Sequence, residues 1–193
     1  MPTFVFDTAV TLNGFLADEH HSLDWLFAVP GGDEPGDLQP QGVTVLVEGS
    51  STYEWVLGHE DLLNQPAKWQ EFYGDSPTFV FTSRELPVPE GADVRFVNGS
   101  VTEALPAIRG AAGDGTVWVV GGGDLAAQFL EAGALDRICL SIAPATVTAG
   151  APLLPRVLGP ERLRLLTARA AGPFARLEYE VLPASGPAPV AGA

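Results

Sequence analysis

Three short segments of the sequence have the residue types and spacing that bind an anion through backbone amides. The clearest is TVWVVGGGDLAAQFLEAG, in which an apolar run leads through Gly121, Gly122 and Gly123 to Asp124 and Leu125 at the start of an amphipathic stretch. Glycines let a phosphate group approach the backbone, and the free N–H groups at a helix start attract it. The pattern is not GxGxxG, so the dinucleotide fingerprint of a Rossmann domain is absent. A tight turn with Asp124 as helix N-cap is the structural alternative.

Two further turns combine hydroxyl groups, a glycine and a guanidinium group, all of which can bind a phosphate. Their residues are Gly49, Ser50, Ser51 and Thr52 in EGSSTYE, and Thr82, Ser83 and Arg84 in FVFTSRE. Taken alone, Ser51 or Thr52 is explained as a helix cap and Arg84 as a solvated charge. All three turns follow apolar runs, and open α/β sheets bind ligands at the C-terminal ends of their strands. The joint occurrence therefore favours one shared anion site.

The elements that position these turns are short apolar or β-branched runs, which predict eight strands. The predicted strands are Thr3–Val10, Val43–Val47, Thr78–Thr82, Val94–Val97, Thr116–Val120, Arg137–Ile142, Leu163–Ala170 and Ala175–Leu182. Several are apolar throughout, which is typical of parallel strands buried on both faces. Only Gly172 and Pro173 separate the last two strands, so we expect an antiparallel C-terminal hairpin at one edge.

Helices are predicted between the strands, as an α/β fold requires. They are Ser51–Leu57, Val101–Ala112 and Asp124–Ala132. Ser100 and Glu103 form a capping-box pattern before the second helix, and Gly113 and Gly133 are suited to end the second and third. The fold class expected is α/β, with a mostly parallel twisted sheet between helices.

Composition limits the function classes. The chain has 193 residues, of which 46% are hydrophobic, and this favours one compact domain, placed at residues 1–182. An acidic loop at 30–42 is expected to be mobile, and a Pro/Ala/Gly tail at 183–193 to be disordered. Ten basic against twenty-four acidic residues give a net charge of −14, which argues against nucleic acid and anionic lipid as partners.

The chain's thiol and imidazole groups show no ligand spacing. A single cysteine, Cys139, cannot form an internal disulfide, and His20, His21 and His59 lie in polar stretches expected to be loops, so no metal site is predicted. No apolar run approaches the ~20 residues of a bilayer span, and the N-terminus does not look like a signal peptide. We therefore expect a cytoplasmic protein with Cys139 in its core.

Five segments, taken in order, resemble the dihydrofolate-reductase-like superfamily. They are TAVTLNGFLADEHHSLDWL, EGSSTYE, FVFTSRE, VWVVGGGDLAAQFLEAGALDRICLSIAPATVTAGAPLLP and a terminal hairpin ending LEYEV. The resemblance runs from Thr3 to Leu182 and is nearest to the reductase domain of riboflavin biosynthesis and its stand-alone bacterial relatives. It implies a three-layer αβα fold and an oxidoreductase that reduces a small heterocycle with NADP(H), NAD(H) being the alternative.

The resemblance also implies where the cofactor lies. The backbones of Ala9 and Leu16 would meet the nicotinamide carboxamide, and Asn13 and Gly14 would begin the loop over it. The diphosphate would lie against the turn at Gly121, Gly122, Gly123, Asp124 and Leu125. The adenosine end would lie among Gly49, Ser50, Ser51, Thr52, Thr82, Ser83 and Arg84.

The sequence departs from the family pattern at three places. The second turn usually reads GRxT, with its arginine on the 2′-phosphate of NADP, whereas this chain has Ser50 there and only Arg84 nearby. The stand-alone relatives usually read LDG where this chain has Asn13 between Leu12 and Gly14. Dihydrofolate reductases place a carboxylate soon after a tryptophan, but LFAVPGG follows Trp25, so dihydrofolate is not the expected substrate.

Several residues are candidates for substrate binding and for proton donation. Trp25 could stack on a flat ring and Asn13 could contact it, while Asp18, Asp24 and Glu54 are candidate proton donors. Each of these acids is equally explained as a solvated or capping carboxylate. The favoured function is a nicotinamide-dependent reductase of a small heterocyclic molecule. The alternative is a non-catalytic or regulatory homodimeric relative that has lost tight cofactor binding, and a homodimer is expected in either case.

Overall fold

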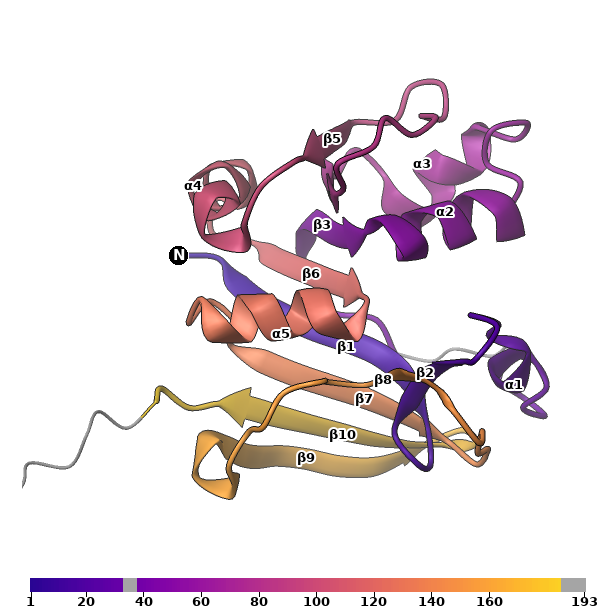
Figure 1. Ribbon diagram of the computed structural model, residues 1–193, viewed down its shortest axis with the longest axis vertical. Helices are drawn as coiled ribbons and strands as arrows, with labels where there is room; N and C mark the ends of the chain where they lie inside the picture. Colours follow the sequence, from indigo (N-terminus) through magenta and orange to yellow (C-terminus); the bar gives the residue numbers. More distant parts are fainter. Residues whose placement is uncertain (33–37, 185–193) are drawn as a thin grey trace, which may run out of the picture.

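A computed structural model describes residues 1–32 and 38–184 of the protein. Its centre is an eight-stranded sheet in the order β5–β4–β3–β6–β1–β7–β10–β9, which Figure 1 shows from top to bottom. The strands are β1 (Thr3–Thr11), β3 (Val43–Gly49), β4 (Thr78–Phe81), β5 (Val94–Val97), β6 (Thr116–Gly121), β7 (Arg137–Ala143), β9 (Leu163–Ala171) and β10 (Phe174–Val181). The eight predicted strands and the antiparallel β9–β10 hairpin are confirmed, and β10 also pairs antiparallel with β7.

Helices cover both faces of this sheet. Helices α4 (Val101–Ala112) and α5 (Gly123–Glu131) lie on one face, and α1 (Asp24–Phe27), α2 (Ser50–His59) and α3 (Ala67–Tyr73) lie on the other. Successive residues of a strand point to opposite faces. Accordingly, Phe79 of β4 packs into the cluster under α4 and α5, while its neighbour Val80 packs into the cluster under α2 and α3. The result is the three-layer αβα architecture.

The helix ends agree with the expectation for α4 and differ for the two helices at the glycine turns. Ser100 and Glu103 form a capping box at α4, and Gly113 ends that helix with φ +59°. The N-cap of α2 is Gly49 and that of α5 is Gly122, and neither makes a side-chain cap hydrogen bond. Asp124 as N-cap is therefore wrong, because its carboxylate instead accepts a hydrogen bond from Gln128.

Five short elements were not predicted, one of them a 3-10 helix at Pro160–Arg162. Strands β2 (Phe15–Asp18) and β8 (Gly150–Pro152) pair antiparallel in a separate two-stranded sheet. Helices α1 and α3 span four and seven residues. Elements of this length have too few residues to show a hydrophobic period in the sequence.

A fully buried carboxyl group lies between the sheet and α3. Glu48 of β3 has no exposed surface, and its Oε1 accepts a hydrogen bond from the Tyr73 hydroxyl at 3.2 Å. Its Oε2 has no hydrogen-bond partner among the residues that the structure describes. Burial raises the pKa of Glu48 from its ordinary 4.5 to about 7. The surroundings therefore favour the neutral form of this side chain.

Some sequence expectations fall outside the described residues. The mobile loop at 30–42 includes residues 33–37, and the disordered tail at 183–193 includes 185–193, none of which the structure describes. Within the part of the chain that is described, no helix has the length and apolar character needed to cross a bilayer.

Candidate cofactor and substrate site

Two of the three glycine and hydroxyl turns meet at one cavity of about 380 Å³, which we call the amide cavity. It lies where β3 leads into α2 and β6 leads into α5, at adjacent C-terminal strand ends. The lining residues from these turns are Gly49, Ser50, Ser51, Thr52, Gly122, Gly123, Asp124 and Leu125. The structure thus brings together residues that the sequence separates by about 70 positions.

Backbone amides dominate the chemistry of the amide cavity. The first N–H groups of an α-helix have no acceptor within the helix. Both α2 and α5 begin at this cavity and neither carries a side-chain cap, so these amides are left for a ligand. Two helix dipoles direct their positive ends at the same space, which suits an anion such as a diphosphate.

The glycines differ in how much room they leave. A Cβ on Gly122 would meet no atom within 4 Å, so its backbone borders open space. A Cβ on Gly123 would lie 2.4 Å from the carbonyl oxygen of Leu153 and 2.5 Å from that of Pro152. Gly123 therefore serves close packing of α5 against the chain that follows β8, whereas Gly122 leaves space at which a ligand can approach.

The charge of Asp124 is compensated. Its Oδ1 lies 3.1 Å from Nη2 of Arg156, whose Nε also donates to Oε1 of Glu131 at 2.7 Å. A single carboxylate beside the α5 N-terminus would repel a phosphate, and the ion pair reduces that repulsion. Sequence reasoning missed Arg156, which lies after β8 in a stretch without a recognisable motif.

The third turn does not line the amide cavity. Nη1 and Nη2 of Arg84 donate to the two carboxylate oxygens of Glu54 at 3.0 and 2.5 Å, and the Arg84 N–H donates to Oγ1 of Thr82. Both partners of this pair are exposed. Glu54 lies one helical turn after Ser50, so the pair holds the guanidinium beside the first turn of α2. The two hydrogen bonds to Glu54 use two of the five guanidinium N–H groups of Arg84.

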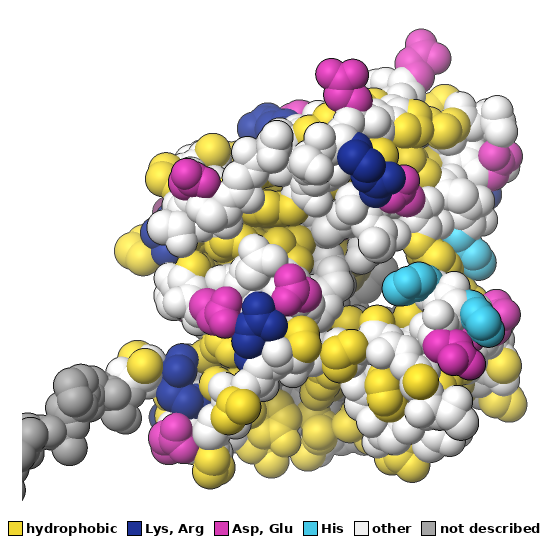
Figure 2. Space-filling view, in the orientation of Figure 1, with side chains coloured by type: hydrophobic (Ala, Val, Ile, Leu, Met, Phe, Trp, Pro, Cys, Tyr) yellow, Lys and Arg dark blue, Asp and Glu magenta, His cyan; other side chains and the backbone are white. Residues whose placement is uncertain are grey.

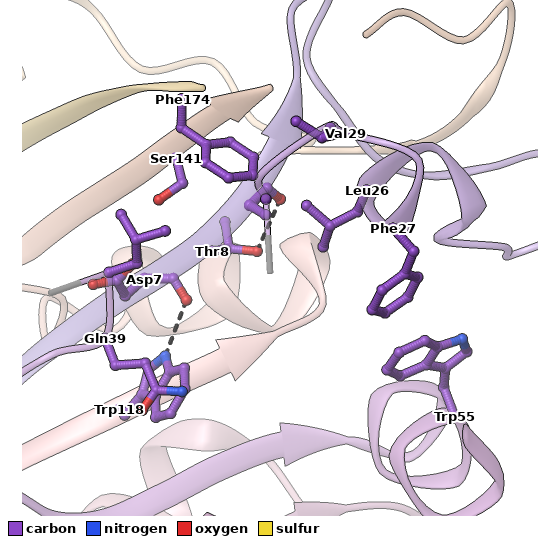
Figure 3. Close-up of a pocket in the computed structure, with 13 residues that line it drawn as sticks. Asp7, Thr8, Leu26, Phe27, Val29, Gln39, Trp55, Trp118, Ser141 and Phe174 are labelled. Carbon is purple, nitrogen blue, oxygen red and sulfur yellow. Dashed lines mark hydrogen bonds between the residues drawn. The ribbon is translucent and has the colours of Figure 1, made fainter. Parts of the chain in front are cut away.

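A second, larger cavity of about 620 Å³ lies between α1 and α2 on the face of the sheet away from α4 and α5. Four aromatic residues are among those that line it, and we call it the aromatic cavity. Phe27 comes from α1, Trp55 from α2, Trp118 from β6 and Phe174 from β10 (Figure 3). A space walled by flat apolar groups favours a flat, largely apolar ring.

One of the residues that line the aromatic cavity, Asp7, belongs to a buried ion pair. Asp7 of β1 and Arg176 of β10 are each about 3% exposed, and two guanidinium nitrogens donate to the two Asp7 oxygens at 2.6 and 2.5 Å. Arg176 also donates to Oγ of Ser141 at 3.1 Å. Burial raises the pKa of Asp7, while the hydrogen bonds from Arg176 act in the opposite direction. Nε1 of Trp118 donates to the Asp7 backbone carbonyl at 2.9 Å, the dashed line at the lower left of Figure 3.

A stack of three rings connects α1 to α2 at the aromatic cavity. The ring centroid of His59 lies 4.7 Å from that of Phe27 and 4.5 Å from that of Trp55, with interplanar angles of 18° and 14°. The prediction of His59 as a loop residue was wrong, because it is the last residue of α2 and packs against these rings. The polar sequence around it did not reveal that the helix continues to this point.

The predicted nicotinamide residues lie around the start of the β1–β2 turn. Ala9 lines the aromatic cavity, and Leu16 packs half-buried against the main core. Asn13 binds within the protein: its Oδ1 accepts from the Thr11 hydroxyl, and its Nδ2 donates to the Val147 carbonyl at 2.7 Å. This side chain therefore fixes the turn to the segment after β7.

The remaining candidates do not line the aromatic cavity. Trp25 packs against the cluster of Val29, Ala143 and Phe174. Asp18 accepts hydrogen bonds from the His20 and Ser22 N–H groups at 2.8 Å each, which lowers its pKa. Asp24 begins α1 and is exposed. Glu54 is paired with Arg84, so Asp7 is the one carboxylate among the described residues that lines the aromatic cavity.

Comparison with known proteins agrees with this architecture. The model of the RibD C-terminal domain family matches residues 2–174. The uncharacterized protein YwjB of Bacillus subtilis is 28% identical over 172 residues, which are 89% of this chain and 93% of YwjB. A pyrimidine reductase-like protein of Corynebacterium diphtheriae has a TM-score of 0.62 at 16% identity, covering 94% of this chain and 92% of that one. Dihydrofolate reductase of Enterococcus faecalis in complex with NADP(H) has a TM-score of 0.59 at 17% identity, covering 92% and 94%. At these identities the two structures establish the fold.

Proposed function

The chain belongs to the RibD C-terminal domain family, and on this premise we propose that it is an NAD(P)H-dependent reductase of a small, flat heterocyclic molecule. The family contains pyrimidine reductase-like proteins, and the dihydrofolate reductase with the same fold binds NADP(H). The proposal assigns the dinucleotide to the amide cavity and the substrate ring to the aromatic cavity.

One observation carries this proposal: helix α2 borders both cavities. Ser51 and Thr52 in its first turn line the amide cavity, and Trp55, one turn later, lines the aromatic cavity. A dinucleotide held by its diphosphate at the helix start can extend along α2 toward a ring held at Trp55. Ala9, expected beside the nicotinamide, lines the aromatic cavity as well.

The amide cavity fits the cofactor that the fold implies, because two uncapped helix starts converge there and Gly122 leaves open space. The bound nicotinamide would supply the hydride. The chain's own residues bind and orient the cofactor and the substrate. The first-turn amides of α2 and α5 hold the diphosphate, while Phe27, Trp55 and Trp118 stack around the substrate ring and exclude water. Each Asp7 oxygen keeps a second lone pair beside its bond to Arg176, and this offers an acceptor for a ring N–H.

The proposal is tested by titrating the purified protein with NADPH and separately with NADH, following quenching of tryptophan fluorescence. Trp55 and Trp118 line the aromatic cavity and should report binding. Saturable binding at roughly micromolar concentration is expected for the preferred nucleotide. If neither nucleotide binds, the non-catalytic alternative is favoured. Homodimer formation stays a prediction, which light scattering can test.

Replacing Gly122 by aspartate is expected to weaken nucleotide binding by at least roughly a hundredfold, because it places a negative charge where the diphosphate approaches. Gly123→Asp is a poorer test, since its side chain would collide with the Pro152 and Leu153 carbonyls and disturb packing. Gly110→Asp in α4 is the matched control, because a Cβ there also meets open space. Unchanged affinity of a folded Gly122→Asp variant would place the nucleotide elsewhere.

Replacing Arg84 by glutamine is expected to lower the affinity for NADPH by roughly tenfold and to leave the affinity for NADH unchanged, as loss of a charge-assisted hydrogen bond to the 2′-phosphate predicts. Arg84 lies beside the first turn of α2, where two of its five N–H groups donate to Glu54. The Kd of each nucleotide is measured by the same titration. Equal losses for both nucleotides would assign Arg84 a structural function at Glu54 instead.

A further inference from the structure

We propose that His21 is a cofactor-binding residue, and that its imidazolium form donates a hydrogen bond to the diphosphate of the nucleotide in the amide cavity. This inference rests on the proposed function and adds a side-chain ligand to a site otherwise built from backbone amides. His21 lines the amide cavity together with the first turns of α2 and α5. Figure 2 shows histidine side chains beside the hollow between the upper and lower parts of this face.

Its capacity for positive charge distinguishes His21 from the other described residues that line the amide cavity. Among the described residues that line the amide cavity there is no lysine or arginine, and the titratable side chains are His21 and Asp124. Asp124 already has a counter-charge in Arg156 at 3.1 Å. A diphosphate carries negative charge, and in a chain of net charge −14 it gains no attraction from the protein as a whole. His21 is thus the one lining side chain that can carry a positive charge to this anion.

The backbone turn presents His21 in a defined conformation. His21 has φ +60°, and its N–H donates to the Asp18 carbonyl at 3.1 Å. The Asp18 carboxylate accepts the N–H groups of the residues on either side, His20 and Ser22. These three hydrogen bonds hold the turn without using the His21 imidazole, which interacts electrostatically with the Asp18 carboxylate and has no hydrogen bond to any residue that the structure describes.

The small β2–β8 sheet anchors this turn to the amide cavity. Asp18, at the end of β2, pairs with Gly150 of β8, and the residues that follow β8 pack against Gly123 at the start of α5. The turn that bears His21 and the amides of α5 are therefore fixed to the same short strand. Ala151 and Pro152 of β8 line the amide cavity as well.

A histidine side chain gains or loses its charge within the range from pH 5 to 8, so a contact through imidazolium makes nucleotide binding stronger at the acidic end. The titratable groups in the turn of His21 are Asp18, Glu19 and His20, and the Asp124–Arg156 pair lies on α5 and after β8.

The test compares His21→Asn with His20→Asn, measuring the Kd of NADPH and NADH by tryptophan quenching at about pH 6 and about pH 8. Asparagine readily adopts positive φ, so the turn is preserved. His20 is the matched control, because it is exposed in the same turn and does not line the cavity. Circular dichroism verifies that both variants fold.

We expect His21→Asn to weaken both nucleotides by roughly tenfold at about pH 6 and much less at about pH 8, with His20→Asn unchanged. Both nucleotides carry the same diphosphate, so equal losses separate this effect from that of Arg84. If the unmodified protein binds nucleotide and His21→Asn binds it equally well at both pH values, the inference is wrong and the proposed reductase function stands. If the unmodified protein binds neither nucleotide, both are wrong.

Discussion

Replacing Asp7 by leucine is expected to lower the free energy of unfolding by about 3–5 kcal/mol, the cost of leaving a buried charge without its partner. Arg176, about 3% exposed, would retain its guanidinium and lose both hydrogen bonds to the Asp7 carboxylate. Its Nε already lacks a hydrogen-bond partner among the described residues, so the neutral Ser141 hydroxyl would be the acceptor that remains for this charge. Urea denaturation followed by circular dichroism measures the effect.

The double variant Asp7→Leu with Arg176→Met distinguishes this cause from general damage to the core. Removing both charges at once leaves no uncompensated ion, so the double variant should recover most of the lost stability. As a control, Asp93→Asn breaks the exposed pair with Arg95 and should change stability by less than about 1 kcal/mol. A double variant as unstable as the sum of the single variants would contradict the argument.

The unmodified protein is expected to become less stable as the pH rises through about 7. Replacing Glu48 by glutamine is expected to abolish this pH dependence. The pKa of Glu48 is about 7 in the folded state against an ordinary 4.5, so the folded state holds a proton that the unfolded state releases. The stabilising contribution is complete below about pH 4.5 and is lost as the pH rises through about 7. The difference corresponds to about 3 kcal/mol.

The measurement is the free energy of unfolding between about pH 4 and pH 8, compared for Glu48→Gln and the unmodified protein. Glutamine keeps an oxygen to accept the Tyr73 hydrogen bond and has no charge to lose. Glu90→Gln, at an exposed position, is the control and should follow the unmodified protein. Parallel pH profiles for Glu48→Gln and the unmodified protein would mean that Glu48 ionises in the fold without penalty.

The fold was largely predictable because its strands are contiguous apolar runs. VTVLV, TFVF and TVWVV are typical of strands buried inside a parallel sheet covered on both faces, and the two residues between the last strands favour a hairpin. What could not be predicted was which strands become neighbours. Strands β3 and β6 lie side by side although five helices and strands separate them in sequence, and that pairing creates the amide cavity.

The two cavities differ in how well the sequence predicted the residues that line them. The amide cavity is built from glycines and hydroxyls at strand ends, which carry a local signal. The aromatic cavity is built from Phe27, Trp55, Trp118 and Phe174, which belong to four separate elements and read individually as core residues. Trp25 was the tryptophan selected for substrate stacking, yet it packs against Val29 and Phe174 outside that cavity.

Charged residues inside strands gave a signal that sequence reasoning did not use. Asp7 interrupts the apolar run of β1, and Glu48 ends that of β3. A charge within a buried strand requires either a partner or a shifted pKa. Asp7 has the partner, Arg176 at a distance of 169 residues along the chain, and Glu48 has the shifted pKa.

The central position of β1 has a consequence for how the chain folds during synthesis. Thr3 pairs with Thr116 of β6, and Val5 pairs with Arg137 of β7, so β1 leaves the ribosome more than a hundred residues before its two neighbouring strands. At the usual rate of translation this delay is on the order of ten seconds. During that time an apolar strand with both edges unpaired is exposed to aggregation. Newly made chains should therefore depend on a chaperone that shields β1 until β7 is complete.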